Sequence, residues 1–353
     1  MCQRHHRHSI FCILPPQVLD QIVRNGKKAD RDWALDALHA DNTQRAMRAS
    51  GAVQPARKTR SNSHPGEIKR TVYTAKNKSD LPGKSVRDED DGPHKDAAVN
   101  QAFDALGATH GFFWEVFQRN SIDDEGLPLL ATVHYGKKYP NAFWDGAQMV
   151  FGDGDGKLFN SFTASLDVIG HELAHGVTQD EAQLAYFNQA GALNESMSDV
   201  FGSLVKQYAL KQTADKADWL IGAELLTKEV KGVALRSLAA PGTAYDDPVL
   251  GKDPQPAHMK DYVRTSDDNG GVHTNSGIPN HAFYLAARAI GGHAWEKAGL
   301  VWYDTLRDKR LKPNAGFAAF AKLTVNNAVT LFGSGSKEAK AIKEAWVAVG
   351  VKV

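Results

Sequence analysis

The sequence predicts an α+β fold in which a β-rich N-terminal lobe is followed by an α-helical C-terminal lobe. Short β-branched and aromatic runs lie within residues 67–163, and from Ser165 onward apolar residues recur at helical spacing. At the boundary stands the stretch 167–178, which holds two histidines four residues apart. Because residues four apart share one face of a helix, we expect this helix to lie between the lobes with both imidazoles side by side.

Residues 1–50 form a separate leader. An apolar run from Ser9 to Leu14 ends at Pro15-Pro16, and apolar residues at helical spacing then predict two short helices on either side of a turn at 26–28. Such a small unit buries too little apolar surface to be stable alone. Residues 50–66, rich in serine, glycine and proline, are predicted to be an exposed linker.

The β-rich lobe is predicted from three runs, at 67–75, 130–135 and 147–151. One helix interrupts them at about 97–117, with a break expected near Gly107 and Gly111. The stretch 152–156 alternates glycine and aspartate. It lacks the glutamate that closes a calcium loop, so we interpret it as a tight hairpin turn.

The C-terminal lobe is predicted to be mainly helical, with a loop-rich stretch at 231–279. The expected helices cover residues up to 179 for the histidine helix, then about 190–210, 280–290, 294–306, 315–330, and a last one after Ser336 as N-cap.

Charge and cysteine content exclude several classes of protein. The net charge is +1, but residues 1–70 hold 13 Lys and Arg against 6 Asp and Glu, so the leader is basic and the body acidic. We expect this asymmetry to help the leader dock. No nucleic-acid motif and no membrane-spanning run is present.

Cys2 and Cys12 both lie near the start, which leaves the body without a disulfide. No signal peptide is readable, which predicts cytoplasmic synthesis, with export by a non-standard route left open.

The histidine helix carries a metal-binding motif. His171 and His175 can both reach one ion, and imidazole nitrogen suits zinc. Glu172 follows the first histidine directly, from where its carboxylate can reach a water on the metal without being a ligand. Two histidines can fall at this spacing by chance, so the motif needs a third ligand.

Glu195, twenty residues after His175, is the candidate for that ligand. Two histidines and one glutamate leave the fourth position of a catalytic zinc open for water. Asp199, one helical turn beyond, could accept the second ring N–H of a ligand histidine, and Asn194 could do so for the other. The alternative for Glu195 is a solvated carboxylate on a helix surface.

These two blocks resemble the thermolysin family of zinc metalloendopeptidases. Two further blocks resemble it as well, Asp267–Ile278, which contains Asn-Gly-Gly-Val-His, and Tyr139–Gly146. The resemblance covers roughly residues 68–353 in the same order, and the short leader with Pro15-Pro16 is similar to the protealysin-like branch. It implies a zincin fold with a propeptide at 1–50, a β-rich lobe at 51–185 that includes the zinc helix, and a helical lobe at 186–353.

The resemblance also implies an activity. The protein would be a neutral zinc endopeptidase, made as a zymogen and monomeric, that acts on proteins and peptides and removes its own propeptide. The propeptide would help folding and cover the cleft. Glu172 would be the general base, while His273, oriented by Asp268, and Tyr186 would stabilise the oxyanion.

The same resemblance implies how substrate is bound. Asn141 and Ala142 match the edge segment that pairs with the substrate backbone, and Arg236 matches an arginine that contacts a substrate carbonyl. The walls of the pocket for the residue after the cut bond match a set of apolar residues: Phe159, Phe162, Val168, Ile221 and Leu235. A preference for leucine, phenylalanine or similar side chains is implied, with the aromatic ring of Phe162 narrowing the pocket.

The chain departs from the family pattern at the double calcium site. Asp167 matches one acidic position, but Lys206, Leu220 and Ala223 stand at others. We expect this calcium site to be absent, with the Lys206 charge in place of the metal. Other calcium sites stay open. Cys12 allows a further hypothesis, that its thiolate fills the open zinc position in the latent enzyme. The alternative, a small buried apolar residue, is the favoured interpretation.

Two other functions compete with the endopeptidase. A zincin-like protein could bind metal and partners without catalysis, but Glu172, Tyr186 and His273 are all present. An aminopeptidase would need a group that binds a free amino terminus, and no such feature is readable in the sequence.

Overall fold

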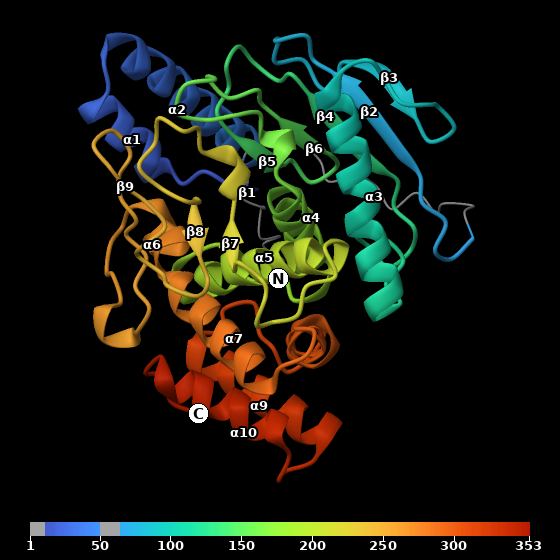
Figure 1. Cartoon of the computed structure of the whole chain (residues 1–353), viewed down its shortest axis with the longest axis vertical. Helices are drawn as coiled ribbons and strands as arrows, with labels where there is room; N and C mark the ends of the chain where they lie inside the picture. The colour runs from blue at the N-terminus through green and yellow to red at the C-terminus, as the bar shows by residue number, and fades with distance from the viewer. Residues whose placement is uncertain (1–10, 50–63) are drawn as a thin grey trace, which may run out of the picture.

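The computed structural model describes residues 11–49 and 64–353, and side chains from 12–39 and 64–353. A β-sheet with one long helix against it forms the upper part, and a group of helices forms the lower part, with two helices between them (Figure 1). This arrangement confirms the α+β fold with a β-rich lobe before a helical one. Within the described residues, no helix is long and apolar enough to cross a membrane.

The main sheet has six strands in the order β1-β5-β6-β4-β2-β3. Four of the five pairings join two strands of the β-rich lobe, and the fifth joins β5 to β1, which comes from the leader. β1 pairs with β5 in antiparallel orientation, and β4 pairs in parallel with both β2 and β6. The strands are β1 (Phe11–Cys12), β2 (Arg70–Thr74), β3 (Lys84–Asp88), β4 (Leu129–Val133), β5 (Ala142–Trp144) and β6 (Met149–Phe151).

The predicted break in the helix α3 (Ala97–Phe117) is wrong, because the helix is continuous. Gly107 does not bend it. A Cβ at this position would lie 2.3 Å from Nη1 of Arg70, and this guanidinium donates a hydrogen bond to the carbonyl of Phe103. The glycine therefore makes room for a side chain from β2 rather than ending the helix.

The predicted hairpin turn at 152–156 is also wrong. The hairpin of this region joins β5 to β6, with its turn closed by a hydrogen bond from the Asp145 N–H to the Gln148 carbonyl. After β6 the chain leaves the sheet. The Asp155 carboxylate accepts hydrogen bonds from three backbone N–H groups, those of residues 157–159, and thereby closes a loop.

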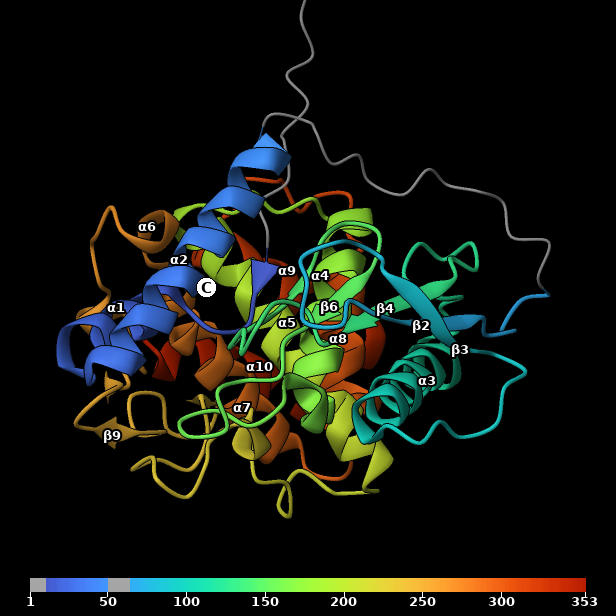
Figure 2. The same cartoon turned by 90° about the horizontal axis from the view of Figure 1, so that it is seen from above.

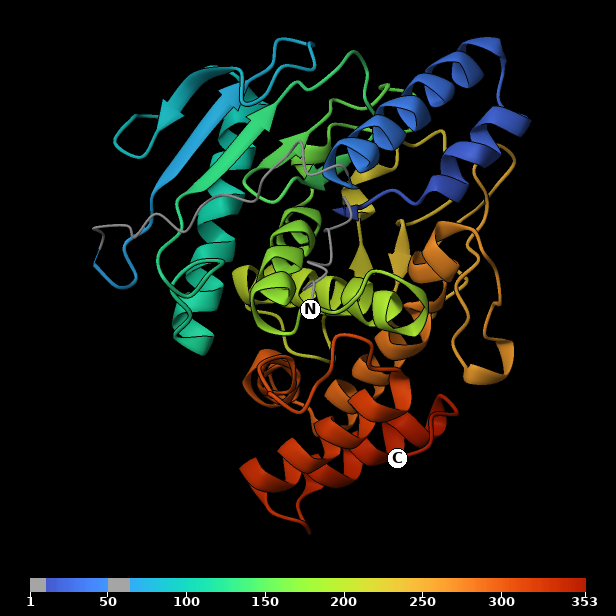
Figure 3. The same ribbon diagram turned by 180° about the vertical axis from the view of Figure 1, so that it is seen from behind.

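Two long helices, α4 (Leu166–Glu181) and α5 (Asn188–Ala209), cross the centre of the molecule (Figures 1 and 3). Their backbones approach closely at glycines. A Cβ at Gly202 would lie 2.3 Å from the carbonyl oxygen of Asp167, so no other residue fits there without a shift. This close packing brings the face of α5 that carries Glu195 against the face of α4 that carries the two histidines.

The remaining helices belong to the helical lobe, and most of them lie in the lower part of Figure 1. Ser336 caps the last of them as predicted, by accepting from the Ala339 N–H. They are α6 (Asp268–Asn275), α7 (Gly277–Ile290), α8 (Leu300–Leu306), α9 (Phe317–Phe332) and α10 (Lys337–Ala348), with short 3-10 or π turns at 162–164, 223–225, 259–261 and 295–299. Two small two-stranded sheets join β7 (Leu220–Ile221) to β8 (Arg236–Ser237) and β9 (Asp246–Asp247) to β10 (Gly251–Lys252).

The leader forms two helices, α1 (Pro16–Asn25) and α2 (Lys28–Ala49), as predicted, and lies over the body (Figure 2). Val18, Leu19 and Ile22 of α1 are buried. We expected a basic leader to dock on an acidic body, but at one contact the charges are reversed. There the leader supplies the acid, because the Lys157 Nζ lies 2.7 Å from a carboxylate oxygen of Asp30.

A histidine in the β-rich lobe gives a pH-dependent contribution to stability. His134 lies between two carboxylates, 2.8 Å from Asp153 and 2.9 Å from Asp96. The hydrogen bond to Asp153 is the largest cause that raises the pKa of His134 from 6.5 to about 9. Since the raised pKa stabilises the protonated form, this contribution is complete below pH 6.5 and is lost as the pH rises through about 9.

We therefore expect His134→Asn to lower the free energy of unfolding by about 1–2 kcal/mol at pH 6 and by almost nothing at pH 10. Asparagine tolerates the left-handed backbone at this position, where φ is 56°. The exposed 23% of the side chain weakens the effect through solvent screening. Urea unfolding of both proteins across this pH range measures it, and a difference that does not change with pH would contradict the assignment.

Candidate active site

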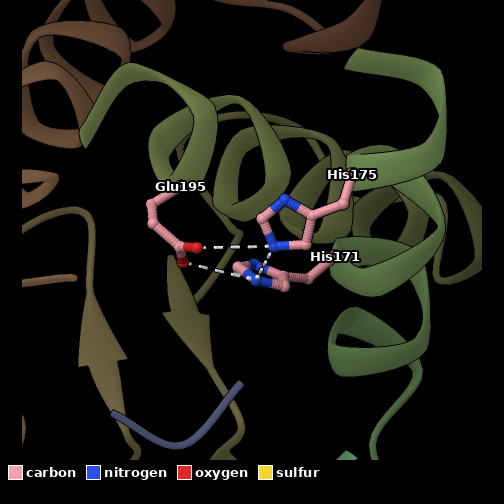
Figure 4. A group of neighbouring side chains, drawn as sticks. All are labelled: His171, His175 and Glu195. Atoms are coloured by element: carbon pink, nitrogen blue, oxygen red, sulfur yellow. Dashed lines mark hydrogen bonds and ion pairs between the residues drawn. The ribbon is translucent and has the colours of Figure 1, made fainter. Parts of the chain in front are cut away.

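The site begins with two histidines on one face of α4. His171 and His175 are fully buried, and their Nε2 atoms lie 3.0 Å apart. Glu195 of α5 faces both, with its carboxylate oxygens 3.6 Å from Nε2 of His171 and 3.5 Å from Nε2 of His175 (Figure 4). Among the residues whose side chains the structure describes, these three form the one group of three or more histidine, cysteine or acidic residues with mutual ligand-atom distances within 4.8 Å.

The second ring nitrogens of both histidines are held in place. The Nδ1–H of His171 donates to Asp199 at 2.8 Å, and that of His175 donates to the amide oxygen of Asn194 at 2.8 Å. The amide of Asn194 is itself oriented, because its Nδ2 donates to the Leu184 carbonyl. With Nδ1 carrying the proton, each Nε2 presents a lone pair toward Glu195, as a metal ligand must.

The donor set fits zinc. Two imidazoles and one carboxylate converge, and the Glu195 Oε2 is buried without a hydrogen-bond partner. Burial lowers the pKa of His175 well below its ordinary value, and the neighbouring His171 lowers it further, so His175 is neutral and able to bind a cation.

Glu172 lies beside this cluster without belonging to it. Its Oε2 accepts a hydrogen bond from the Trp144 N–H at 3.1 Å, and its Oε1 is buried without a hydrogen-bond partner. Burial raises the pKa of Glu172 well above its ordinary value, and the Glu195 carboxylate adds to the rise. N–H groups of Trp144 and Ile13 oppose it. A divalent cation nearby would favour the carboxylate form.

Two hydrogen-bond donors, His273 and Tyr186, lie on the other side of the group formed by His171, His175 and Glu195. The Nδ1–H of His273 donates to Asp268 at 2.7 Å, and its Nε2 lies 3.3 Å from the Tyr186 hydroxyl and 3.5 Å from Glu195. Burial disfavours the charged form of His273, but Asp268 and then Glu195 outweigh it, so its pKa is raised. The Tyr186 hydroxyl donates to Glu195.

The loop before His273 explains its orientation. Residues 269–271, Asn-Gly-Gly, all have positive φ, and a Cβ at Gly270 would lie 2.1 Å from the Asn188 side chain. This left-handed run turns the chain so that the Asp268 carboxylate accepts from both the backbone N–H and the ring of His273.

The leader strand β1 crosses this site. Its register aligns Cys12 with Phe143 of β5. The Ile13 N–H donates to the Ala142 carbonyl at 3.2 Å, and the Leu14 N–H donates to the Asn141 side chain at 3.0 Å. Asn141 and Ala142, the residues expected to pair with a substrate backbone, therefore pair with the chain's own leader.

Arg236 is almost completely buried and bonds to both the leader and Asp199. Its Nη1 donates to the Ile13 carbonyl at 2.9 Å, while Nε and Nη2 grip the Asp199 carboxylate. The same carboxylate binds His171, so one acid links a metal ligand to the arginine on the backbone of the leader. Burial would raise the pKa of Asp199, but Arg236 and His171 outweigh it and hold it below its usual range.

Ile13 and the predicted pocket residues all belong to the buried hydrophobic core of the molecule, and the Ile13 side chain is fully buried. The Phe159 and Phe162 rings are 6.1 Å apart, and Ile221 pairs with Arg236 across the small β7–β8 sheet. All of the predicted pocket residues are buried: Phe159, Phe162, Val168, Ile221 and Leu235.

Sequence reasoning missed two buried amides. Asn280 of α7 donates to Asp199 Oδ2 at 2.8 Å, and Gln255 donates to the His273 carbonyl at 2.8 Å. Both fix residues of the site from elements distant in sequence. No periodicity or spacing distinguishes them from other buried amides.

At the position of the expected calcium replacement, the Lys206 ammonium lies 2.6 Å from Asp167 and 2.8 Å from the Leu220 carbonyl. Both charged side chains are almost entirely buried. Cys12, by contrast, is not a member of the group of converging ligands. Its thiol is buried, and its backbone carbonyl accepts a hydrogen bond from His273 at 3.0 Å. Its role as a latency ligand stays a hypothesis.

Comparison with known proteins gives matches to two family models over most of the chain. Residues 46–179 match the catalytic domain of thermolysin metallopeptidase, and residues 182–351 match its alpha-helical domain.

Relatives match along nearly the whole chain. An extracellular metalloprotease of Pectobacterium carotovorum subsp. carotovorum is 54% identical over 344 residues, which is 98% of this chain and 97% of the relative. Protease PrtS of Photorhabdus sp. (strain Az29) is 52% identical over 348 residues, covering 97% and 92%. Among solved structures, the precursor of protealysin, a metalloproteinase from Serratia proteamaculans, matches with a TM-score of 0.89 and 57% identity, covering 97% of this chain and 100% of that one.

Proposed function

Since this chain belongs to the thermolysin family of metallopeptidases and is a zinc-dependent endopeptidase made as a zymogen, we propose which of its residues perform the reaction. His171, His175 and Glu195 hold the zinc, and Glu172 is the general base. The observation that supports this assignment is the convergence of these three ligand atoms beside an unpartnered carboxylate oxygen of Glu172.

Zinc supplies a nucleophilic water near neutral pH and charge stabilisation at the carbonyl that is attacked. Glu172 accepts the proton of the water and later delivers it to the leaving amine. His273 and Tyr186 donate hydrogen bonds to the oxygen that becomes negatively charged, each contributing roughly 3 kcal/mol. Asp268 keeps His273 oriented, and Asp199 and Asn194 fix the two ligand imidazoles.

Substrate binds by adding a strand to β5. Asn141 and Ala142 engage its backbone, as they engage the leader, and Arg236 holds the carbonyl of the residue after the cut bond. This side chain enters the apolar pocket beside Phe162. The enzyme therefore prefers apolar residues such as leucine or phenylalanine immediately after the cut bond, and Phe162 limits their size.

The leader, residues 1–50, is removed during maturation, leaving a β-rich lobe at 51–185 and a helical lobe at 186–353. The mature enzyme is a monomer that acts outside the cell. The relatives from Pectobacterium, named as extracellular, and from Serratia, named as a precursor, support this proposal.

We expect the enzyme matured from the full chain to cut internal bonds of peptides blocked at both ends. Leucine or phenylalanine after the cut bond should give rates at least about 10-fold above glycine there, because the pocket is apolar. Mass spectrometry of the products measures both features. An aminopeptidase would leave the blocked peptides intact and cut only those with a free amino terminus, which would contradict the proposal.

A further inference from the structure

The leader lies across the active site with the polarity and register of a substrate. At one peptide bond, both flanking groups contact the proposed machinery. The Cys12 carbonyl accepts from His273 at 3.0 Å. The Ile13 N–H donates to the Ala142 carbonyl at 3.2 Å, and it also acts to lower the pKa of Glu172. His273 is a proposed oxyanion donor and Glu172 the proposed proton donor to the leaving amine.

The contacts that follow continue the same pattern. The Ile13 carbonyl accepts from Arg236 at 2.9 Å, and the Ile13 side chain is buried in the hydrophobic core. The Leu14 N–H and carbonyl both engage the Asn141 side chain, at 3.0 and 3.4 Å. Each polar contact assigned to a substrate on the side after the cut bond is thus made by the leader.

We propose that the Cys12–Ile13 bond is itself a substrate of this site, a self-cleavage point within the propeptide that is separate from its removal near residue 50. The inference rests on the proposed function. Water adds to the Cys12 carbonyl carbon and the C–N bond breaks. Cys12 receives a carboxylate, and the proton goes through Glu172 to the new amino group of Ile13.

The fold also explains why this cleavage is slow in the intact zymogen. After hydrolysis the new amino terminus would remain in place, because Ile13 and Leu14 keep their contacts and α1 is anchored directly behind them. Val18, Leu19 and Ile22 are buried, Gln17 donates to Thr274, and Asp30 pairs with Lys157. A held amine beside a held carboxylate re-forms the peptide bond efficiently, as expected from high effective concentration.

The arrangement therefore resembles an inhibitor that binds as a substrate and is released slowly. It predicts that the same residues, without the helices that anchor them, are an ordinary substrate. A blocked peptide of residues 11–16, Phe-Cys-Ile-Leu-Pro-Pro, contains every leader group that contacts the site. We expect its net cleavage to be on the order of 100-fold faster than that of the bond in the full chain.

The test uses the full chain with zinc, followed by intact mass and by labelling of new amino termini. We expect a slowly accumulating pair of fragments, one ending at Cys12 and one beginning at Ile13, in wild type but not in Glu172→Gln. Ile13→Val should keep this pair, whereas Ile13→Asp, which places a charge in the apolar pocket, should abolish it. Glu172→Gln enzyme whose leader has been removed by another protease should also bind the blocked peptide, and bind its reversed sequence at least 10-fold more weakly.

The outcomes separate this inference from the function it rests on. If an unrelated blocked peptide is cut but no product begins at Ile13, from the full chain or the blocked hexapeptide, the inference is wrong and the endopeptidase stands. If neither peptide is cut by zinc-loaded enzyme, the endopeptidase assignment itself fails. A product beginning at Ile13 that persists in Glu172→Gln comes from another protease and overturns the inference as well.

Discussion

Replacing Glu172 by glutamine is expected to lower kcat for peptide hydrolysis by about 10²- to 10⁴-fold. Glutamine has nearly the same shape and can still accept the Trp144 N–H through its amide oxygen. It cannot accept a proton from water or deliver one to the leaving amine. The loss should therefore appear in kcat, with KM nearly unchanged, because the contacts to substrate backbone come from other residues.

The measurement is steady-state cleavage of a blocked peptide after another protease has removed the leader from both proteins, with zinc content determined on the same samples. Glu344→Gln is a matched control, since this glutamate is exposed on α10, far along the chain from the site. A variant at residue 172 that binds zinc normally and retains more than a tenth of wild-type kcat would contradict the assignment of the general base. Equal loss of zinc and activity would instead indicate that Glu172 is a ligand.

The metal site could be predicted from the sequence because its information is local. His171 and His175 share a helical face, and Glu195 and Asp199 stand one turn apart on the next helix, so spacing alone places their side chains. The structure brings the two faces together through the glycine contact at Gly202. That contact is what converts two separate patterns into one cluster.

The parts that failed depend on partners far away in sequence. Gly107 suggested a helix break only because Arg70, which fills the space, could not be seen beside it. Asp155 suggested a turn, but its loop is closed by hydrogen bonds to residues that follow it. The roles of Asn280 and Gln255 likewise rest on tertiary contacts, to Asp199 and to the His273 backbone.

The leader illustrates a prediction that was correct in outline and incomplete in detail. Its two helices follow from local periodicity, whereas the pairing of β1 with β5 joins residues more than a hundred positions apart. Nothing in the six-residue apolar run indicates its register. The register is set by backbone contacts of the leader to Arg236, Asn141 and Ala142, which lie far from it in sequence.

Replacing Lys206 by methionine is expected to destabilise the protein by about 3–5 kcal/mol. The ammonium lies 2.6 Å from Asp167, and the side chains are only 6% and 0% exposed. Burial opposes the charged form of Lys206, but Asp167 outweighs it and raises the pKa of the lysine. Methionine fills similar volume and leaves the Asp167 carboxylate buried without a counter-charge. The contact with Asp218 adds little, because that carboxylate is 44% exposed.

This prediction is best measured by urea unfolding in the Glu172→Gln background, where self-digestion is prevented. Adding Asp167→Asn to Lys206→Met should recover most of the loss, because asparagine carries no charge but keeps an oxygen for the Ser165 hydroxyl and the Gly222 N–H. Lys216→Met, which removes an exposed lysine, should change stability by less than about 0.5 kcal/mol.

The same samples decide whether a cation or the lysine neutralises Asp167. If Lys206 does so, removing calcium from zinc-saturated protein should leave its stability unchanged, and Lys206→Met should not regain stability on adding calcium unless the vacated position binds it. A calcium site in the wild type would instead raise the free energy of unfolding by about 2.7 kcal/mol at 100 times its Kd. Such a rise in wild type would show that the ammonium and a cation occupy different places, because two positive charges within 3 Å of one carboxylate repel each other strongly in a buried setting.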